Sequence, residues 1–287
     1  MGRHAVPIEH YSDRLNRVAD YVDTHIASPI ALSELARLAA FSLNHFRRIF
    51  SEWAGESPGD YVLHRRLDVS AALLTYMPGL PVGEIARRCG FNSAESYSRA
   101  FRQHFRMTPS EWRGGGHVRW DALLNPQPAV PHLLWDVQVK EMARTRVLYL
   151  RKIGSYYDQD KEYWLRLWTL VLQLGLGKPR LYGSGLDNPA VTPPARCRFD
   201  LCAEIPESLA LPPEVSSKYI GGGLYAIVNF AGPKSEMEGH WRWMLNDWLP
   251  HSGFHYGQGA CIERHLTYPS EMDLVNCELC VPLERHS

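Results

Sequence analysis

The sequence has no long uninterrupted apolar run. None of its apolar stretches reaches the roughly 18–20 residues that cross a bilayer. The opening residues, Met1 to Pro7, lack the apolar segment of a secretory signal and lead directly into a charged, helix-like pattern. We therefore expect a cytoplasmic protein with no membrane partner.

Cysteine is scarce, and its spacing is not that of a disulfide framework. Six Cys in 287 residues fit reduced thiols. Cys277 and Cys280 have C-x-x-C spacing, but they fall in an expected strand with no second pair of ligands nearby. Phosphate-binding loops, nucleophile elbows and dinucleotide fingerprints are missing as well. We expect no metal and no cofactor.

Lysine is absent from the first 113 residues, where arginine supplies the side-chain positive charge. This segment has 14 Arg and 12 Asp or Glu, a net charge of +2, whereas residues 114–287 have 17 basic and 19 acidic residues, a net charge of −2. Three glycines at 114–116 and three prolines between 126 and 131 separate the halves, a composition typical of a linker. The length suggests two domains, which we place at 1–113 and 137–287, with a linker at 114–136.

The two halves differ in their hydrophobic patterns. Apolar residues recur every three or four positions in the first half, beginning with Tyr11, Leu15, Val18, Val22 and Ile26, a pattern that Pro29 interrupts. In the second half, short β-rich runs at 147–150 and 225–228 alternate with longer helical patterns. The sequence predicts an all-α N-terminal domain and an α+β C-terminal domain.

An internal repeat organises the first half. Residues 32–41 align with 82–91 at an offset of 50. After one inserted residue the offset becomes 51, and Phe46 and Phe50 then align with Tyr97 and Phe101. Each copy indicates a short helix, a turn and a second helix, with Gly90 in a left-handed turn position that Ala40 fills in the first copy. Two helix-turn-helix units joined by a helix at 58–77 predict DNA binding in two major grooves. The alternative is a helical bundle whose repeat reflects duplication alone.

This half resembles the DNA-binding domain of the AraC/XylS transcriptional regulators over residues 10–113. The second unit carries the specific matches: Ile85, Ala86, Cys89, Gly90, Phe91, Tyr97, Arg99, Phe101, Phe105, Thr108, Pro109, Trp112 and Arg113. The resemblance implies a tandem, homeodomain-like bundle that binds double-stranded DNA. It also implies base contacts from two groups of residues: Asn44, Arg47 and Arg48 in the first unit, and Ala94, Glu95, Ser96 and Arg99 in the second.

The chemistry of these side chains fits base recognition. Arginine forms paired hydrogen bonds with guanine, and asparagine does so with adenine. Glu95 is either an acceptor for cytosine N4 or a solvated acid at a helix N-terminus. The remaining arginines are interpreted as phosphate contacts or solvated charges: Arg65, Arg66, Arg87, Arg88 and Arg106.

The second half repeats as well. Residues 146–154 match 224–232 at an offset of 78, and each copy continues with a Trp-rich helix and then a strand that runs into proline. Two β-α-β-β units facing each other predict a central groove lined by aromatic residues.

This half resembles the GyrI-like effector-binding domain over about residues 137–285. The matching segments are 154–156, 187–189, 196–200, 221–223, 231–233 and 262–264. A helix-turn-helix pair followed by this domain resembles the arrangement in Rob-type regulators. The resemblance implies that a groove glutamate, here Glu263, contacts cationic aromatic effectors. Tyr156, Trp164 and Trp168 are the expected aromatic contacts.

Physical arguments agree with that role for Glu263. A carboxylate attracts a desolvated organic cation, and aromatic faces add about 0.5–2 kcal/mol each. Strand alternation puts Glu263 on one face with Cys261 and His265, away from Arg264. Two alternatives stay open: Arg264 or Arg198 neutralises Glu263, and the tryptophans belong to the core.

The sequence therefore predicts a sequence-specific transcriptional regulator, not an enzyme, that binds an asymmetric DNA site as a monomer. Its C-terminal groove is expected to bind a small hydrophobic or cationic effector. The resemblance adds RNA polymerase as a partner and transcription activation in a multidrug response as a role. The alternatives for the C-terminal domain are a hydrolase of small electrophilic compounds, with Glu263 activating water, and an inert protein-interaction module.

Overall fold

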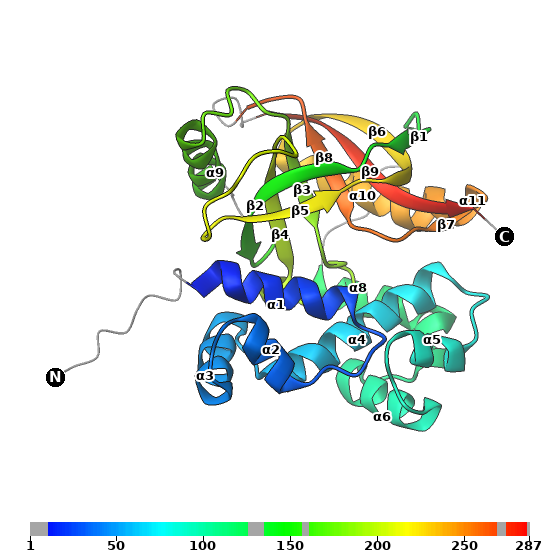
Figure 1. Cartoon of the computed structure of the whole chain (residues 1–287). Coiled ribbons are helices and arrows are strands. Elements are labelled where there is room, and N and C mark those ends of the chain that lie inside the picture. The colour runs from blue at the N-terminus through cyan, green and yellow to red at the C-terminus, as the bar shows by residue number, and fades with distance from the viewer. Residues whose placement is uncertain (1–10, 126–134, 157–160, 269–273, 286–287) are drawn as a thin grey trace. The chain divides into compact units, whose positions relative to one another are not determined.

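The computed structural model describes residues 11–125, 135–156, 161–268 and 274–285 (Figure 1). Its contacts divide the chain into an N-terminal unit, Met1–Trp120 with Pro212–Ser216, and a C-terminal unit, Asp121–Leu211 with Ser217–Ser287. The division falls within helix α8 (His117–Leu124), which lies in the segment expected to be a linker. Residues 126–134 of that segment lie outside the described residues.

The N-terminal unit is helical throughout its described elements. In chain order these are α1 (Ser12–Thr24), α2 (Leu32–Leu38), α3 (Leu43–Ala54), α4 (Pro58–Tyr76), α5 (Val82–Arg88), α6 (Ala94–Phe105), α7 (Pro109–Glu111) and a π-helical turn (Trp112–Gly116) that leads into α8. The predicted tandem helix-turn-helix fold is confirmed: α2 and α3 form the first unit, α5 and α6 form the second, and α4 joins them.

Serine and threonine caps begin four of these helices. Ser42, Ser57 and Ser93 each accept a hydrogen bond from the backbone N–H three residues further on. Thr108 forms a reciprocal capping box with Glu111. The caps at Ser42 and Ser93 set where α3 and α6 begin, and therefore which side chains their first turns present.

Each helix-turn-helix unit has its own apolar core. In the first unit, Leu35, Phe46 and Phe50 are buried with the apolar face of α1. In the second, buried aromatic side chains follow one another at van der Waals distance: Tyr97, Phe101, Phe105 and Trp112. The Trp112 indole N–H donates to the Ala71 carbonyl oxygen at 3.1 Å, which ties this core to α4.

The C-terminal unit is a nine-stranded antiparallel sheet with two long helices. The elements are β1 (Gln138–Met142), β2 (Thr145–Ile153), α9 (Lys161–Gln173), β3 (Leu181–Gly185), β4 (Arg198–Glu204), β5 (Ser216–Ile220), β6 (Gly223–Gly232), α10 (Lys234–Trp243), α11 (Leu249–His251), β7 (Phe254–Tyr256), β8 (Cys261–His265) and β9 (Val275–Arg285). A 3₁₀ turn (Pro194–Arg196) precedes β4, and a π-helical turn (Met244–Trp248) follows α10.

The sheet confirms the predicted duplication and extends it. Its order is β1-β6-β9-β8-β3-β4-β2-β5, with β7 pairing to β9 (Figure 1). Each predicted β-α-β-β repeat gains a strand at its start, β1 before β2 and β5 before β6. These added strands are exchanged, because β1 pairs with β6 of the second repeat and β5 lies beside β2 of the first. The repeats meet where β3 pairs with β8.

One face of this sheet forms an apolar core of side chains, and the other is covered by helices. On one face, Tyr149, Tyr182, Tyr225 and Ile262 belong to an apolar core that also includes residues of the exchanged strands. On the other face lie α9 and α10: Trp164 of α9 contacts His265, and His240 of α10 contacts Phe230. Glu263 lies on this second, helix-bearing face, because it alternates with Ile262 and shares its side with His265.

Candidate nucleic-acid interface and ligand groove

Helix α3 presents polar side chains outward and apolar ones inward. Phe46, Ile49 and Phe50 are buried, whereas Asn44, Arg47 and Arg48 are exposed. Arg48 approaches Glu52, one turn further on, at 3.8 Å, and both side chains are largely exposed. A pair of this kind contributes little and can open in favour of another partner. The three residues expected to contact bases therefore lie together on one accessible helix face.

Helix α6 presents the second group of expected base contacts. Ala94, Glu95, Ser96 and Arg99 are all exposed, and they occupy the first two turns after the Ser93 cap. Hydrogen bonds from its own backbone amide and from Ser93 lower the pKa of Glu95. This geometry suits an acid at a helix N-terminus, the second of the two interpretations of Glu95, and its contact with cytosine stays a prediction.

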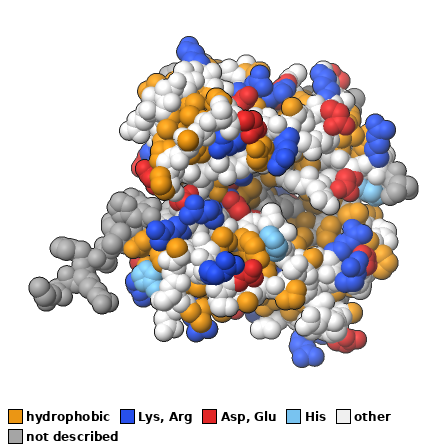
Figure 2. All heavy atoms as spheres, in the orientation of Figure 1, with side chains coloured by type: hydrophobic (Ala, Val, Ile, Leu, Met, Phe, Trp, Pro, Cys, Tyr) orange, Lys and Arg blue, Asp and Glu red, His pale blue; other side chains and the backbone are white. Residues whose placement is uncertain are grey.

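An arginine row continues along α6 beyond the first turns. Arg99, Arg102 and Gln103 lie on one side of α6 because they are three and four residues apart. Together with Arg106, the left-handed C-cap residue of this helix, they line a shallow hollow. On the face drawn in Figure 2, Lys and Arg side chains are interspersed with Asp and Glu. Because residues 1–113 have a net charge of only +2, this arginine group is a local concentration of positive charge.

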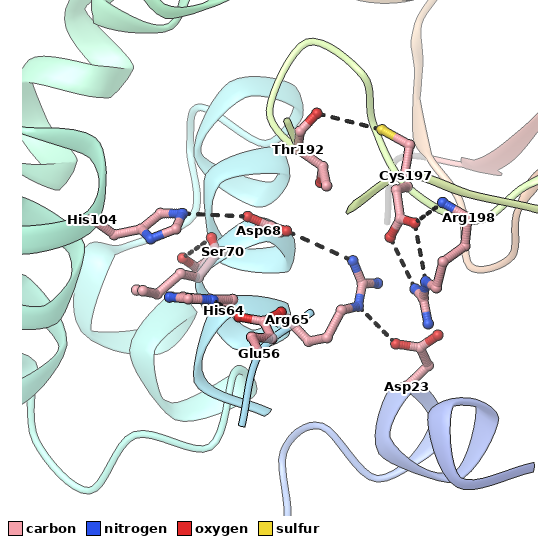
Figure 3. A network of polar contacts seen from close by, with 12 residues as sticks. Asp23, Glu56, His64, Arg65, Asp68, Ser70, His104, Thr192, Cys197 and Arg198 are labelled. Carbon is pink, nitrogen blue, oxygen red and sulfur yellow. Dashed lines mark hydrogen bonds and ion pairs between the residues drawn. The ribbon is translucent and has the colours of Figure 1, made fainter. Parts of the chain in front are cut away.

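Two arginines interpreted as phosphate contacts are occupied by structural bonds instead. Arg65 donates from Nε to Asp23 at 2.9 Å, and its side chain is only 10% exposed (Figure 3). Arg66 donates to the carbonyl oxygens of Ile26 and Ser28 at 3.2 and 2.7 Å. Both hold α4 to the end of α1 and the segment that follows it. Sequence reasoning missed this role because the partners are about 40 residues away along the chain.

The pair Arg87 and Arg88 is partly occupied as well. Both donate to Glu84 at the start of α5, at 2.6 to 2.9 Å. These hydrogen bonds lower the pKa of Glu84 to about 2. Both arginines are exposed, so they stay accessible to a phosphate, in contrast to Arg65.

Glu263 lies at the centre of the sheet, where the two repeats meet. It is paired with Gly183 across the β3–β8 ladder. A Cβ atom added at Gly183 would lie 2.9 Å from Glu263 Oε2 and 2.4 Å from the Phe199 ring. The missing side chain at 183 therefore leaves room for the carboxylate beside an aromatic ring. The Glu263 side chain is 13% exposed.

Neither arginine considered as a counter-ion neutralises Glu263. Arg264 forms a close ion pair with Glu278 on the opposite face of the sheet. Arg198 binds Asp187 through Nε and Nη2, at 3.0 and 2.9 Å (Figure 3). The charged group that does approach Glu263 is the imidazole of His265, with Nε2 3.2 Å from Oε2. Sequence alternation had placed His265 on this face without indicating a role for it.

The four expected effector contacts are placed differently from one another. Trp164 is buried and meets His265 edge to face, with 4.9 Å between ring centroids. It therefore lies beside the Glu263–His265 pair. Trp168, one turn further along α9, packs against Tyr268, with 5.3 Å between the ring centroids.

The ring of Tyr156, and not its hydroxyl, is the part of this side chain that approaches the surroundings of Glu263. The hydroxyl donates to the carbonyl oxygen of Arg198 at 2.8 Å and accepts from the backbone N–H of Asp187 at 2.9 Å. Burial, and then the Asp187 carboxylate, raise the pKa of Tyr156 well above its usual range. Its ring contacts Phe199, the residue that flanks Glu263, so a ligand would meet the aromatic face only.

The C-x-x-C pair is divided between the two faces of β9. Cys277 is paired with His265 and Cys280 with Ile262, and these partners lie on opposite sides of β8. Burial raises the pKa of Cys280 to about 12 and that of Cys277 still further. Among the described residues, no group of three His, Cys, Asp or Glu side chains is arranged to hold a metal ion.

Two protein-family models match the chain: a helix-turn-helix domain over residues 35–115 and a GyrI-like small molecule binding domain over residues 136–284. The chain is similar to the transcriptional regulator Rob of Salmonella typhimurium strain LT2, at 24% identity over 92% of this chain and 96% of Rob. It is also similar to the probable transcriptional regulator LumQ of Photobacterium leiognathi, at 33% identity over 35% of this chain. The match covers only part of these relatives: 41% of LumQ, and 16% of an uncharacterized helix-turn-helix regulator of Staphylococcus aureus that is also similar to this chain.

Solved structures of proteins with AraC-type DNA-binding domains are also similar to part of this chain. One, a transcriptional regulator from Chromobacterium violaceum, is 27% identical, covers 36% of this chain and 91% of its own, and has a TM-score of 0.34. Within the residues that the structure describes, no helix combines the length and the apolar character needed to cross a membrane.

Proposed function

The chain belongs to the family of the GyrI-like small molecule binding domain and joins that domain to a helix-turn-helix domain, and we propose a separate role for each domain in transcriptional regulation. Helices α3 and α6 read DNA, and the groove around Glu263 binds a small effector. Bacterial promoters lie in the cytoplasm, where the protein acts and where RNA polymerase is its partner.

The observation that carries the DNA half of this proposal is the matched design of α3 and α6. Each helix begins at a serine cap, buries three apolar or aromatic residues and exposes an arginine on its outer face, Arg48 in one and Arg99 in the other. Exposed arginines at equivalent positions of two tandem units suit guanine recognition in two major grooves. The row that continues through Arg102 and Arg106 suits contact with phosphates.

The substitution Arg99→Ala tests this assignment. A DNA site is first selected from a randomised duplex pool with the whole protein, and mobility shifts are then measured on single-base variants of that site. We expect a loss of about 1–3 kcal/mol on the best site and relaxed preference at one base pair, because a bidentate contact to guanine is removed.

Arg37 provides the matched control, since it is an exposed arginine on α2, outside the two outer helices. Arg37→Ala should leave the base preference unchanged. An equal loss on every base variant for Arg99→Ala would reassign Arg99 to phosphate contact.

The observation that carries the effector half is a carboxylate for which the described residues supply no arginine partner. Glu263 is largely buried beside the Phe199 ring, and Trp164 packs against the adjacent His265, while Arg264 and Arg198 are committed to other acids. A largely buried carboxylate lacking a strong cation is costly, and a bound organic cation would offset that cost. The groove therefore suits a small cationic aromatic effector.

The substitution Glu263→Gln tests this half. We expect calorimetry to show at least tenfold weaker binding of benzyltriethylammonium, a permanent cation with one aromatic ring, because the charge attraction is lost. The fold should persist, since the amide keeps the size of the acid. Equal affinity for both proteins would contradict the proposed site.

We further propose that the groove senses its ligand without converting it, as expected of relatives named for transcriptional regulation. A candidate effector incubated with the protein should be recovered unchanged by chromatography. Steady turnover that disappears in Glu263→Gln would instead identify a hydrolase.

A further inference from the structure

We infer that His265 is a specificity-determining residue of the groove: its protonated imidazole and a cationic effector compete for the same carboxylate, Glu263. Only the neutral imidazole leaves the carboxylate available to a cation. This inference rests on the effector site proposed above and adds to it a residue that selects the charge of the ligand.

The placement of His265 makes this competition direct. Its side chain is 4% exposed, and its Nε2 lies 3.2 Å from Glu263 Oε2. The two residues alternate along β8, so both point to the helix-bearing face. In the described part of the chain, neither Nδ1 nor Nε2 of this buried ring makes a hydrogen bond, so the approach of Nε2 to Glu263 Oε2 is a close contact without hydrogen-bond geometry. Within the described ranges, the charged side chain recorded against this ring is Glu263, the proposed ligand contact.

Among the residues that the structure describes, the groups packed against the pair from the neighbouring strands do not supply a competing charge. From β9, Cys277 lies opposite His265, and burial followed by the nearby Glu263 raises the pKa of its thiol. From β3, the opposite residue is Leu181. On β8 itself, Cys261 shares the face, and burial raises the pKa of its thiol to about 11. Both thiols therefore stay neutral at ordinary pH.

The packed helix contributes a ring and no nearby charge. Trp164 of α9 covers His265 edge to face, and three ionisable residues of that helix are exposed: Lys161, Glu162 and Arg166. Tyr163 is half-buried and has the Arg166 guanidinium over its ring. Glu263 and His265 are thus the two ionisable side chains in direct contact here, and histidine is the residue type whose charge most readily responds to pH in the physiological range.

The charge of the pair then decides which ligand fits. With a neutral imidazole the pair carries one negative charge, which suits a monocation. With an imidazolium the pair is neutral, and a second positive charge in the same low-dielectric space is repelled. Cation binding and proton binding at His265 therefore oppose each other by linkage.

The experiment measures benzyltriethylammonium binding to the whole protein by calorimetry, from about pH 8 to about pH 5.5, in two buffers of different ionisation enthalpy. One unit below its pKa a histidine is about nine-tenths protonated, so the affinity should fall about tenfold over this range. Binding should release close to one proton per cation at the acidic end and close to none at the alkaline end.

His265→Gln and His265→Phe should bind the cation with less than about twofold change over the same range and should release no proton. The phenyl ring keeps the contact with Trp164 if the polar substitution disturbs packing. His251→Gln is the control, because His251 is an exposed histidine at the far end of the same unit, on α11; it should behave as the unchanged protein does.

The outcomes separate this inference from the proposed function. If the unchanged protein binds the cation with no pH dependence and Glu263→Gln abolishes binding, the site stands and the role of His265 is overturned. The role is equally overturned if the His265 variants keep the tenfold pH dependence. If Glu263→Gln binds as well as the unchanged protein at about pH 8, the site itself is wrong, and the inference falls with it.

Discussion

Two single residues set the turns of the helix-turn-helix units, and they do so at unequal cost. Ala40 and Gly90 both have positive φ, 54° and 74°. This conformation costs a residue with a Cβ atom roughly 1–2 kcal/mol through steric strain, whereas glycine adopts it without that strain. At Gly90 space is limiting as well, because a Cβ atom would lie 2.5 Å from the Ile26 carbonyl oxygen and 2.9 Å from the Arg66 guanidinium. Glycine is therefore required in the second turn and only preferred in the first.

We predict opposite effects for the reciprocal substitutions at these positions. Ala40→Gly should stabilise the N-terminal unit by about 0.5 kcal/mol, the strain relieved minus the extra chain entropy of glycine. Gly90→Ala should destabilise it by more than about 2 kcal/mol, because strain and a backbone clash add together. Urea denaturation, analysed for the transition of this unit, gives both values. A mild loss at Gly90 would mean that the segment at Ile26 yields easily.

Strands β2, β4 and β5 are connected by a buried ion cluster. Asp200 on β4 accepts hydrogen bonds from Arg151 on β2, at 2.7 Å from both Nε and Nη2, and from Lys218 on β5 at 2.6 Å. Burial alone raises the pKa of Asp200, but Arg151 and Lys218 more than offset this, and the resulting pKa lies below the ordinary value. The cluster therefore stabilises the edge of the sheet where the exchanged strand β5 joins.

We predict that Asp200→Asn destabilises the C-terminal unit by about 3–5 kcal/mol at neutral pH, because the buried Arg151 loses its counter-ion. The folded pKa is below the unfolded one, so this stability is present above the ordinary aspartate pKa of about 3.9 and is lost as pH falls through the lower, folded value. The difference between the two proteins should therefore shrink in acid. Urea denaturation from neutral pH downward measures it.

Glu141→Gln is the control for this substitution, since Glu141 is an exposed acid on the opposite edge strand, β1. It should change stability by less than about 0.5 kcal/mol at any pH in the series. A constant difference between Asp200→Asn and the unchanged protein down to acidic pH would show that the carboxylate is not the titrating group.

The whole molecule carries no net charge, with 31 basic and 31 acidic residues. Long-range attraction to DNA should therefore be weak, and we expect binding to depend on the exposed arginines of α3 and α6 proposed as DNA contacts. The effector controls this binding only if it has unequal affinity for the DNA-bound and free proteins. Such coupling is reciprocal, since DNA must change effector affinity by the same factor.

We predict a reciprocal coupling of about 5- to 150-fold between benzyltriethylammonium and the selected DNA site in the full chain. DNA affinity is measured with and without saturating cation, and cation affinity with and without saturating DNA. Glu263→Gln should remove the coupling while leaving DNA affinity without cation unchanged. Independent binding of the two ligands would identify the C-terminal unit as an interaction module or an enzyme.

Local periodicity and internal repetition were sufficient to predict the tandem helix-turn-helix units, the duplicated α+β unit and the face on which Glu263 lies. These features depend on residues close in sequence or on a constant offset, so they are readable without coordinates. The serine caps at 42 and 93 are local in the same sense, because each accepts a hydrogen bond from a backbone amide three residues further on.

Other features were decided by packing between distant segments. Arg65 and Arg66 were expected to be phosphate contacts or solvated charges. Instead α4 brings them against the end of α1 and the segment after it, where they donate to Asp23 and to the carbonyl oxygens of Ile26 and Ser28. The exchange of β1 and β5 and the freedom of Glu263 from Arg264 likewise follow from strand pairing. A side chain's partner is set by which surfaces meet once the core is buried, and neither composition nor spacing along the chain records that meeting.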